Sequence, residues 1–266
     1  MPLRGSPTGG TPTAALGAGW TDLSPTFEGW SAVTPGTSAA DLLRGVAERA
    51  ATGGAPSGAG RYHYVRTCGW YLRSVTRISR RGAAHGPSTS TVEPFEREQW
   101  IAPDGSGRLV VTSNGHPVRP SGEFGPGGLG ARFLTGTDRA AVAEVVRDGD
   151  GTAGALRAIT GVWLRQVVPP DLRRALLLAL ADLDGLEVVG ETRDHLGRAG
   201  VAVAHHDRER RTRVVLVFHA RHGWLLGREE IALPGARVSL PTPVSTSNTL
   251  VTLTGYTETT TEQPQA

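Results

Sequence analysis

Lysine is absent from this sequence, since all 28 of its Lys and Arg residues are arginine. The single cysteine excludes an intrachain disulfide and a zinc site built from cysteines. The longest apolar run, Ala175 to Leu183, is much shorter than the ~20 residues that span a bilayer. Residues 1–20 contain no apolar core of the kind a signal peptide needs. The sequence therefore predicts a fold without cross-links and without a membrane span of its own.

Concentrated positive charge is also lacking. The formal net charge is only +3 over 266 residues. The densest basic cluster, "DRERRTR" at 207–213, mixes two acids with its arginines and is typical of a solvated hairpin turn. Because proteins that bind nucleic acid usually gather their positive charge on one surface, we expect no nucleic-acid partner.

The chain divides into three parts by composition. Residues 1–37 are rich in Gly, Pro, Ser and Thr without a period, which predicts a disordered leader or linker. Residues 38–258 carry the periodic patterns of a single α+β domain. Residues 259–266 are polar, and we expect a disordered tail.

Helical periodicity predicts four helices. The clearest covers 169–184, with proline at its start, an acid in its first turn and Gly185 after its end. An amphipathic stretch that Ser38 can cap covers 38–51. Weaker helical patterns cover 137–148 and 154–168, the second with Trp163 packed inward.

Alternating patterns predict the strands, joined by turn residues. The expected strands are 62–77, 96–102, 108–112, 186–194, 200–207, 212–220, 224–233 and 249–256. Residues 80–91 and 113–130 are expected to be loops. The order of helix, strands, helices, strands predicts an α+β fold in which a few helices cover a curved antiparallel meander.

The run "GRYHYVRTCGWYL" is unusual for its aromatic content. Neither face of this strand is cleanly polar, so it packs on both sides or lines a cleft. Tyr and Trp bury much area while keeping a polar group, and a role in the core is favoured over ligand binding. We expect Trp70 and Tyr64 to be buried between the sheet and the helix 169–184. If a ligand or partner cleft exists, its candidate residues are Tyr62, Tyr64, Arg66, Trp70, Trp100 and Trp163.

Cys68 lies in the middle of the same strand and has two interpretations. A buried cysteine behaves as a small hydrophobic residue. Arg66 on the same face could instead lower the thiol pKa and make it reactive. The inert interpretation is favoured.

Enzymatic signals are weak. The sequence has neither a G-x-S-x-G elbow nor a phosphate-binding loop, and its neighbouring acids suit salt bridges to arginine. His205, His206, His219 and His222 lie on neighbouring meander elements, and imidazole suits zinc, copper or nickel. However, adjacent histidines on a strand point to opposite faces. We expect no metal and no other cofactor.

Several blocks occur in an order that resembles a known family. They are "GRYHYVRTCGWYL", "EREQWIAPDGSGR", "VPPDLRRALLLALADLDGLEVVGETRDHLGRAGVAV" and "HARHGWLLGREEIAL". Together they resemble an actinobacterial family of uncharacterised proteins with one extracytoplasmic domain behind an N-terminal membrane helix. The family that it resembles has no assigned enzymatic activity. The sheet pattern is also similar to lipoprotein-carrier and sigma-regulatory sensor domains, which implies a half-barrel.

These observations predict a non-enzymatic binding or sensing domain of an envelope protein. It would engage a lipid-like ligand or a protein partner through a cleft between sheet and helices. The alternative is a hydrolase or metal-dependent enzyme that uses the meander histidines. The chain begins in what resembles the linker after the membrane helix. A start codon further upstream would therefore place the protein at the extracytoplasmic face of the membrane, held by that anchor, whereas Met1 as the true start would make it cytoplasmic.

Overall fold

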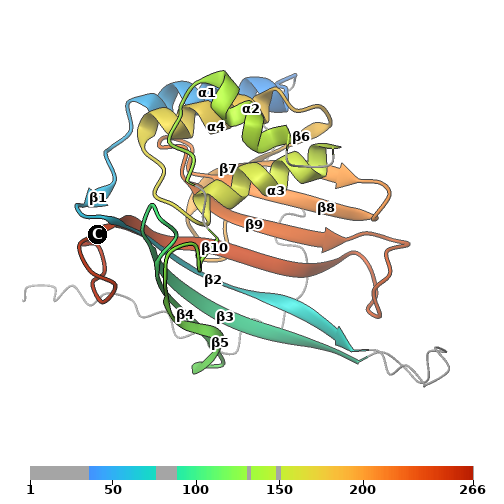
Figure 1. The fold of residues 1–266 in the computed structure, drawn as a ribbon. Coiled ribbons are helices and arrows are strands. Elements are labelled where there is room, and N and C mark those ends of the chain that lie inside the picture. Colours follow the sequence, from blue (N-terminus) through green and yellow to red (C-terminus); the bar gives the residue numbers. More distant parts are fainter. Residues whose placement is uncertain (1–35, 76–88, 131–132, 148–150, 266) are drawn as a thin grey trace, which may run out of the picture.

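The fold is one open antiparallel sheet with helices on one side, seen in a computed structural model (Figure 1). The structure describes residues 36–75, 89–130, 133–147 and 151–265. Within these ranges it contains ten strands in one sheet and four α-helices. The predicted α+β class with a curved antiparallel sheet is confirmed.

The sheet joins two meanders through its last strand. The strand order is β5-β4-β3-β2-β10-β9-β8-β7-β6, with the short β1 paired in parallel to β10. The C-terminal strand therefore lies at the centre. The strands are β1 (Ser57–Gly58), β2 (Tyr62–Val75), β3 (Thr89–Ile101), β4 (Gly107–Ser113), β5 (His116–Phe124), β6 (Leu186–Arg193), β7 (Ala199–Asp207), β8 (Thr212–Phe218), β9 (Leu225–Ala232) and β10 (Val244–Thr257).

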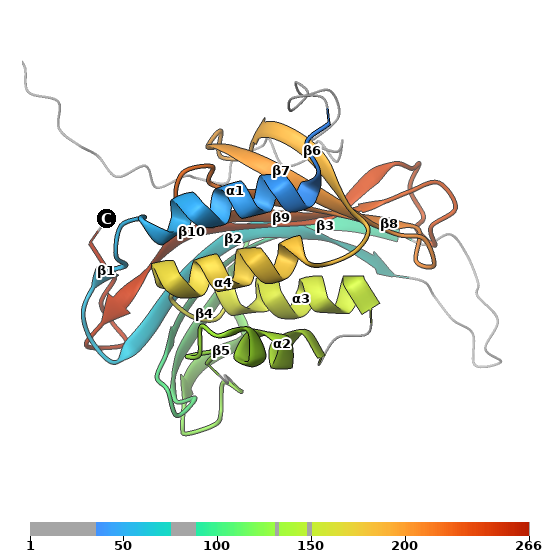
Figure 2. The same cartoon turned by 90° about the horizontal axis from the view of Figure 1, so that it is seen from above.

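All four described helices lie on the same side of the sheet (Figures 1 and 2). The helix N-cap predicted at Ser38 is present, because its hydroxyl oxygen accepts a hydrogen bond from the Asp41 amide at 3.0 Å. None of the described helices is long and apolar enough to cross a membrane. The helices are α1 (Ala39–Ala51), α2 (Arg139–Arg147), α3 (Gly151–Trp163) and α4 (Pro170–Ala181).

Strand alternation gives the sheet two different faces. On the helix face, Val203, Leu216 and Phe218 pack with the buried side chains of the helices. On the opposite side, which we call the back face, neighbouring residues of the same strands form a second apolar cluster. The members of that cluster are Ala202, Ala204, Val215, Val217, Leu226 and Ile231.

The prediction of a loop at 113–130 is wrong over much of its length, because this segment contains strand β5. Asn114 and Gly115 have φ values of 50° and 77°, which suits the tight hairpin turn between β4 and β5. Two prolines, Pro117 and Pro120, lie within β5. An edge strand tolerates them because one side of its backbone has no strand partner.

The C-terminal end also differs from the expected disordered tail over 259–266. The Trp100 indole N–H donates to the Glu262 carbonyl, and the Gln263 side-chain amide donates to Glu98 at 3.0 Å. Pro264 is buried. These side-chain contacts to β3 hold a segment whose polar composition alone predicts no structure. Most of the expected leader at 1–37 and of the expected loop at 80–91 lies outside the described residues.

Candidate binding groove

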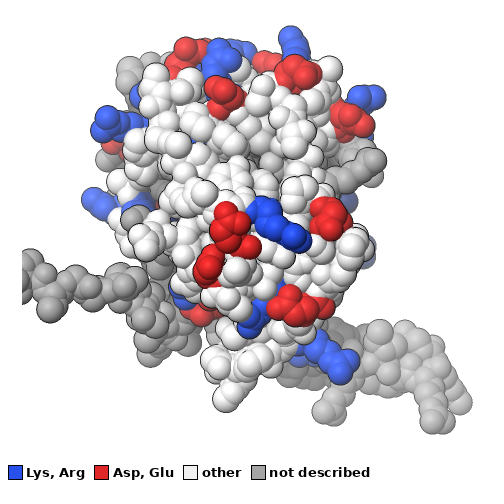
Figure 3. All heavy atoms as spheres, turned by 60° about the vertical axis from the view of Figure 1, so that its left-hand side comes forward, with Lys and Arg blue, Asp and Glu red and all other residues white. Residues whose placement is uncertain are grey.

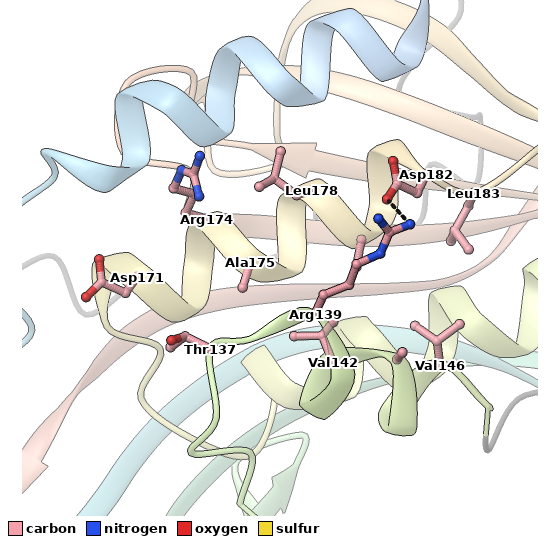
Figure 4. Close-up of a pocket in the computed structure, with 12 residues that line it drawn as sticks. Thr137, Arg139, Val142, Val146, Asp171, Arg174, Ala175, Leu178, Asp182 and Leu183 are labelled. Carbon is pink, nitrogen blue, oxygen red and sulfur yellow. Dashed lines mark ion pairs between the residues drawn. The ribbon is translucent and has the colours of Figure 1, made fainter.

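A hollow of about 650 Å³ runs between α2 and α4 (Figure 4). We call it the inter-helix groove. Val142 is buried at its base, Ala143 is exposed, and the other apolar side chains are only partly buried. The floor is therefore apolar and open to an occupant. Its apolar residues are Val142, Ala143, Val146, Ala175, Leu178, Ala179 and Leu183.

Local hydrogen bonds fix the start of α2. The Asp138 carboxylate accepts a hydrogen bond from the Ala141 amide at 2.9 Å and caps the first turn of α2. The side-chain amide of Gln166 both donates to and accepts from the backbone of Leu134, each at 2.9 Å. The segment leading into α2 is thus tied to the end of α3. Since Val142 is the one buried residue of α2, the rest of its apolar side stays available to the groove.

A salt bridge crosses the groove near the C-terminal end of α4. Arg139 reaches from α2 to Asp182, with 3.7 Å between Nη2 and Oδ2 (Figure 4). Arg44 of α1 approaches the other oxygen of Asp182 at 3.4 Å. The Arg139 side chain is 93% exposed, and exposed pairs of this kind contribute about 0–1 kcal/mol. An incoming partner can therefore displace this guanidinium at small cost.

The other end of the groove is also charged. Asp171 and Arg174 lie in the first turns of α4, and Arg174 approaches Glu48 of α1 at 3.5 Å. Both ends thus offer a carboxylate and a guanidinium, with an apolar floor between them. Charges of both signs are also interspersed on the face of the molecule shown in Figure 3.

A smaller hollow of about 250 Å³, the sheet–helix cleft, opens where β10 continues past the start of β9. Trp163 lines it from α3, and Val251 and Leu253 line it from β10. Arg198 spans the opening, donating to the carbonyls of Val251 at 2.7 Å and Leu226 at 2.8 Å. Its charge is paired with the buried Asp194 at 2.6 Å. The cleft is smaller than the ~300–1,000 Å³ typical of ligand pockets, and its cation is already engaged.

The structure separates the six residues predicted for one cleft. Tyr64, Arg66 and Trp70 alternate on one face of β2, and register pairs Tyr64 with Trp100. Trp70 pairs with Asn248, which pairs with Glu229 and so with Val215 of the back-face cluster. Tyr62 is two residues before Tyr64 on β2 and therefore lies on the same face. The structure thus brings five of the residues together on the back face, whereas Trp163 packs against Phe218 on the helix face.

Trp70 and Tyr64 are 1% and 0% exposed, as predicted. Their predicted position beneath the helix 169–184 is wrong. The helix face of β2 belongs instead to the odd-numbered residues, since His63 Nδ1 accepts a hydrogen bond from the Val167 amide at 3.1 Å. Tyr64 lies 5.0 Å from Trp100 between ring centroids and donates to Glu98 at 3.1 Å. Burial and then Glu98 raise the pKa of the Tyr64 phenol.

Cys68 is a buried free thiol on the same face. Burial raises its pKa, with a further contribution from Glu96, and these effects outweigh the opposing ones of Arg198 and Arg66. A raised pKa keeps the sulfur protonated and a poor nucleophile. The inert interpretation of Cys68 is therefore the one that the structure favours.

The meander histidines do not share a site. His206 pairs with Arg213 near the start of β8, whereas His219 follows its end. At ~3.3 Å per residue, these positions are about 20 Å apart. His219 Nδ1 instead accepts hydrogen bonds from the amides of Arg221 and His222 within its own turn. Over the ranges that the structure describes, no group of three or more His, Cys, Asp or Glu residues could hold a metal ion.

Arg173 is a buried cation that the sequence reasoning missed. It is 0% exposed and donates to the carbonyls of Val168, His222 and Gly54 at 3.1, 2.7 and 3.1 Å. Its guanidinium carbon lies 3.7 Å from the centroid of Trp224. Burial lowers its pKa to about 10, so it stays charged at neutral pH. The available signal was its place four residues before Leu177, on the apolar side of α4.

Comparisons with known proteins show little. No protein-family model matches this chain, and no curated protein matches it. Eight chains of solved structures match. MucB in complex with MucA(peri) is 16% identical with a TM-score of 0.29, covering 83% of this chain and 56% of that chain. MucB alone is 15% identical with a TM-score of 0.28, covering 83% of this chain and 59% of that chain.

This chain therefore spans little more than half the length of the MucB chains that it matches. Identities and TM-scores this low carry no functional argument. The resemblance to the actinobacterial family remains a prediction.

Proposed function

We propose that this chain is a non-enzymatic binding domain that holds an apolar segment of a protein partner in the inter-helix groove. The observation that carries the proposal is the open apolar floor between α2 and α4, closed at each end by exposed charges. Its volume of about 650 Å³ falls within the range of natural ligand sites.

A protein segment suits the shape and charges of this groove. The 12 residues of α4 give a wall about 18 Å long at 1.5 Å per residue. A groove of that length matches an amphipathic helix that inserts side chains at i, i+3 or i+4, and i+7. The charges at both ends can pair with polar residues flanking the inserted stripe. The family resemblance adds the expectation that this binding takes place outside the cytoplasmic membrane.

The groove replaces the sheet–helix cleft as the proposed site. The cleft is smaller, and Asp194 and two carbonyls already engage its arginine. The enzymatic alternative loses its geometric basis because the histidine pairs lie at opposite ends of β8. A lipid-like ligand in the groove is kept as an outcome of the test.

Photo-crosslinking in the native host tests the proposal. A benzoylphenylalanine at Ala179 in the groove is compared with one at Val118, which is 37% exposed on the distant β5. We expect a discrete protein adduct at Ala179, lost when Leu178→Glu is added, and none at Val118. An adduct to a lipid alone would identify the other ligand class. Equal labelling at both positions would contradict binding in the groove.

A further inference from the structure

The back-face cluster is buried without a described layer over it. Its six members are between 0% and 5% exposed. Among the described residues, the partly buried apolar side chains packed against it are Val189 of β6 and Leu233, which follows β9. Both belong to the sheet or its edge, so neither covers the face. All four described helices lie on the opposite side (Figure 2).

The apolar area of the back face continues beyond this cluster. Strand register aligns Val217 of β8 with Gly227, then with Leu250 of β10, and then with Cys68 of β2. Trp70 follows two residues along β2. Large apolar side chains each gain about 1.5–3 kcal/mol from burial. An area spanning five strands therefore needs a covering layer of comparable apolar content.

The chain before Gly36 has such content. Residues 16–30 contain five large apolar side chains, whereas residues 1–13 contain only Met1 and Leu3. The spacing alternates between four and three residues along this stretch. The five side chains are Leu16, Trp20, Leu23, Phe27 and Trp30.

The described chain begins on the helix side, next to the edge of the sheet that leads to this face. Helix α1 packs against β6, and its N-terminal end lies beside that edge strand (Figure 2). The sheet order places β7, which carries Ala202 and Ala204, next to β6. Crossing from β6 to β10 takes about 20 Å at ~4.8 Å per strand. Fifteen residues reach up to about 50 Å, so this stretch is long enough to cross the face.

We propose that residues 16–30 form the layer that covers the back face, with Trp20, Leu23, Phe27 and Trp30 packed on β7 to β10 and β2. The N-terminal stretch is then part of the folded domain rather than a free linker. This inference is independent of the inter-helix groove, which lies on the other side of the molecule.

Cys68, the sole cysteine, reports the covering of this face. We expect Leu23→Asp combined with Phe27→Asp in the full chain to raise the rate at which a chromogenic disulfide reagent labels Cys68 at least tenfold. Thr8→Asp combined with Thr11→Asp is the matched control and should stay within twofold of the wild-type rate. Leu177→Ala, a core substitution on the helix side, is the control for lost stability. The labelling rates of all variants are compared at temperatures equally far below their own melting temperatures. Unchanged labelling in the Leu23/Phe27 variant overturns the proposal.

A second measurement covers the case in which that variant does not fold. Benzoylphenylalanine at Leu23 in the otherwise native chain should crosslink within the same molecule to peptides from β8, β9 or β10. Crosslinks to the helices would overturn the proposal. Crosslinks between two copies, with a doubled mass in light scattering and faster Cys68 labelling on dilution, would instead assign the cover to a second molecule.

Discussion

The two faces of the sheet use charge in different ways. On the helix face, buried polar groups such as Arg173 and Gln99 bond to backbone carbonyls and tie the helices to the strands. On the back face, Arg66 lies between Glu96 and Glu98 at 3.7 and 3.8 Å, beside the aromatic rings. The described hollows open on the helix side. The comparison teaches that the aromatic strand is part of a buried layer, and it is the reason why we propose the outer surfaces of the helices as the site of recognition.

Replacing Trp70 should have the largest effect and tests whether the back face is a true core. Trp70→Ala should lower the free energy of unfolding by about 3–5 kcal/mol, the usual cost of removing a buried large aromatic. Tyr71→Ala is the matched control, because this neighbour is 43% exposed on the other side of β2 and should cost about 1 kcal/mol or less. Urea unfolding measures both. A Trp70→Ala variant as stable as Tyr71→Ala would mean that Trp70 is a binding surface.

Replacing the buried cation Arg173 on the helix face should reduce stability by a comparable amount. Arg173→Met keeps much of the side-chain volume but leaves three carbonyls without their donor. We expect a loss of about 3 kcal/mol, since unpaired buried polar groups are costly. Arg174→Met, next in sequence but exposed toward Glu48, should change the unfolding midpoint little. Equal effects of the two substitutions would show that the buried contacts of Arg173 contribute nothing.

A smaller effect should appear as pH dependence on the helix face. Burial lowers the pKa of His63 from 6.5 to about 4, so the unfolded chain takes up the proton first. Its contribution is fully present above pH 6.5 and is lost as the pH falls towards 4, by about 2–3 kcal/mol in all. His63→Gln should remove this part of the pH dependence. Stability curves of the two proteins that stay parallel between pH 7 and 4 would contradict the assignment.

The smallest effect should come from the salt bridge across the groove. Arg139→Ala should change the free energy of unfolding by less than about 1 kcal/mol, because the pair with Asp182 is exposed. Arg210→Ala breaks another exposed pair, with Asp207, and is the control. A much larger loss for Arg139→Ala in thermal unfolding would mean that the arginine holds α2 in place and does not move aside for a partner.

The sequence predicted most of the architecture because local patterns decide it. Alternation located β2 and the C-terminal meander, and the proline and apolar stripe located α4. The strand β5 was missed because its prolines suggested a loop, although Asn114-Gly115 signalled a hairpin. The site was harder, since a face assignment depends on which side of the sheet the helices cover. The side of the sheet that the helices cover depends on contacts between segments distant in sequence. The helices pack on the face that carries Trp163, which leaves Trp70 on the opposite one.

The central claim is that the inter-helix groove binds a protein segment, and fluorescence anisotropy tests it most directly. The peptide found by crosslinking at Ala179 would be labelled and titrated with the wild-type chain, Leu178→Glu and Val118→Glu. We predict that Leu178→Glu raises Kd at least tenfold, which corresponds to about 1.4 kcal/mol, while Val118→Glu stays within twofold of the wild type. Equal affinity of the wild type and Leu178→Glu would contradict the account.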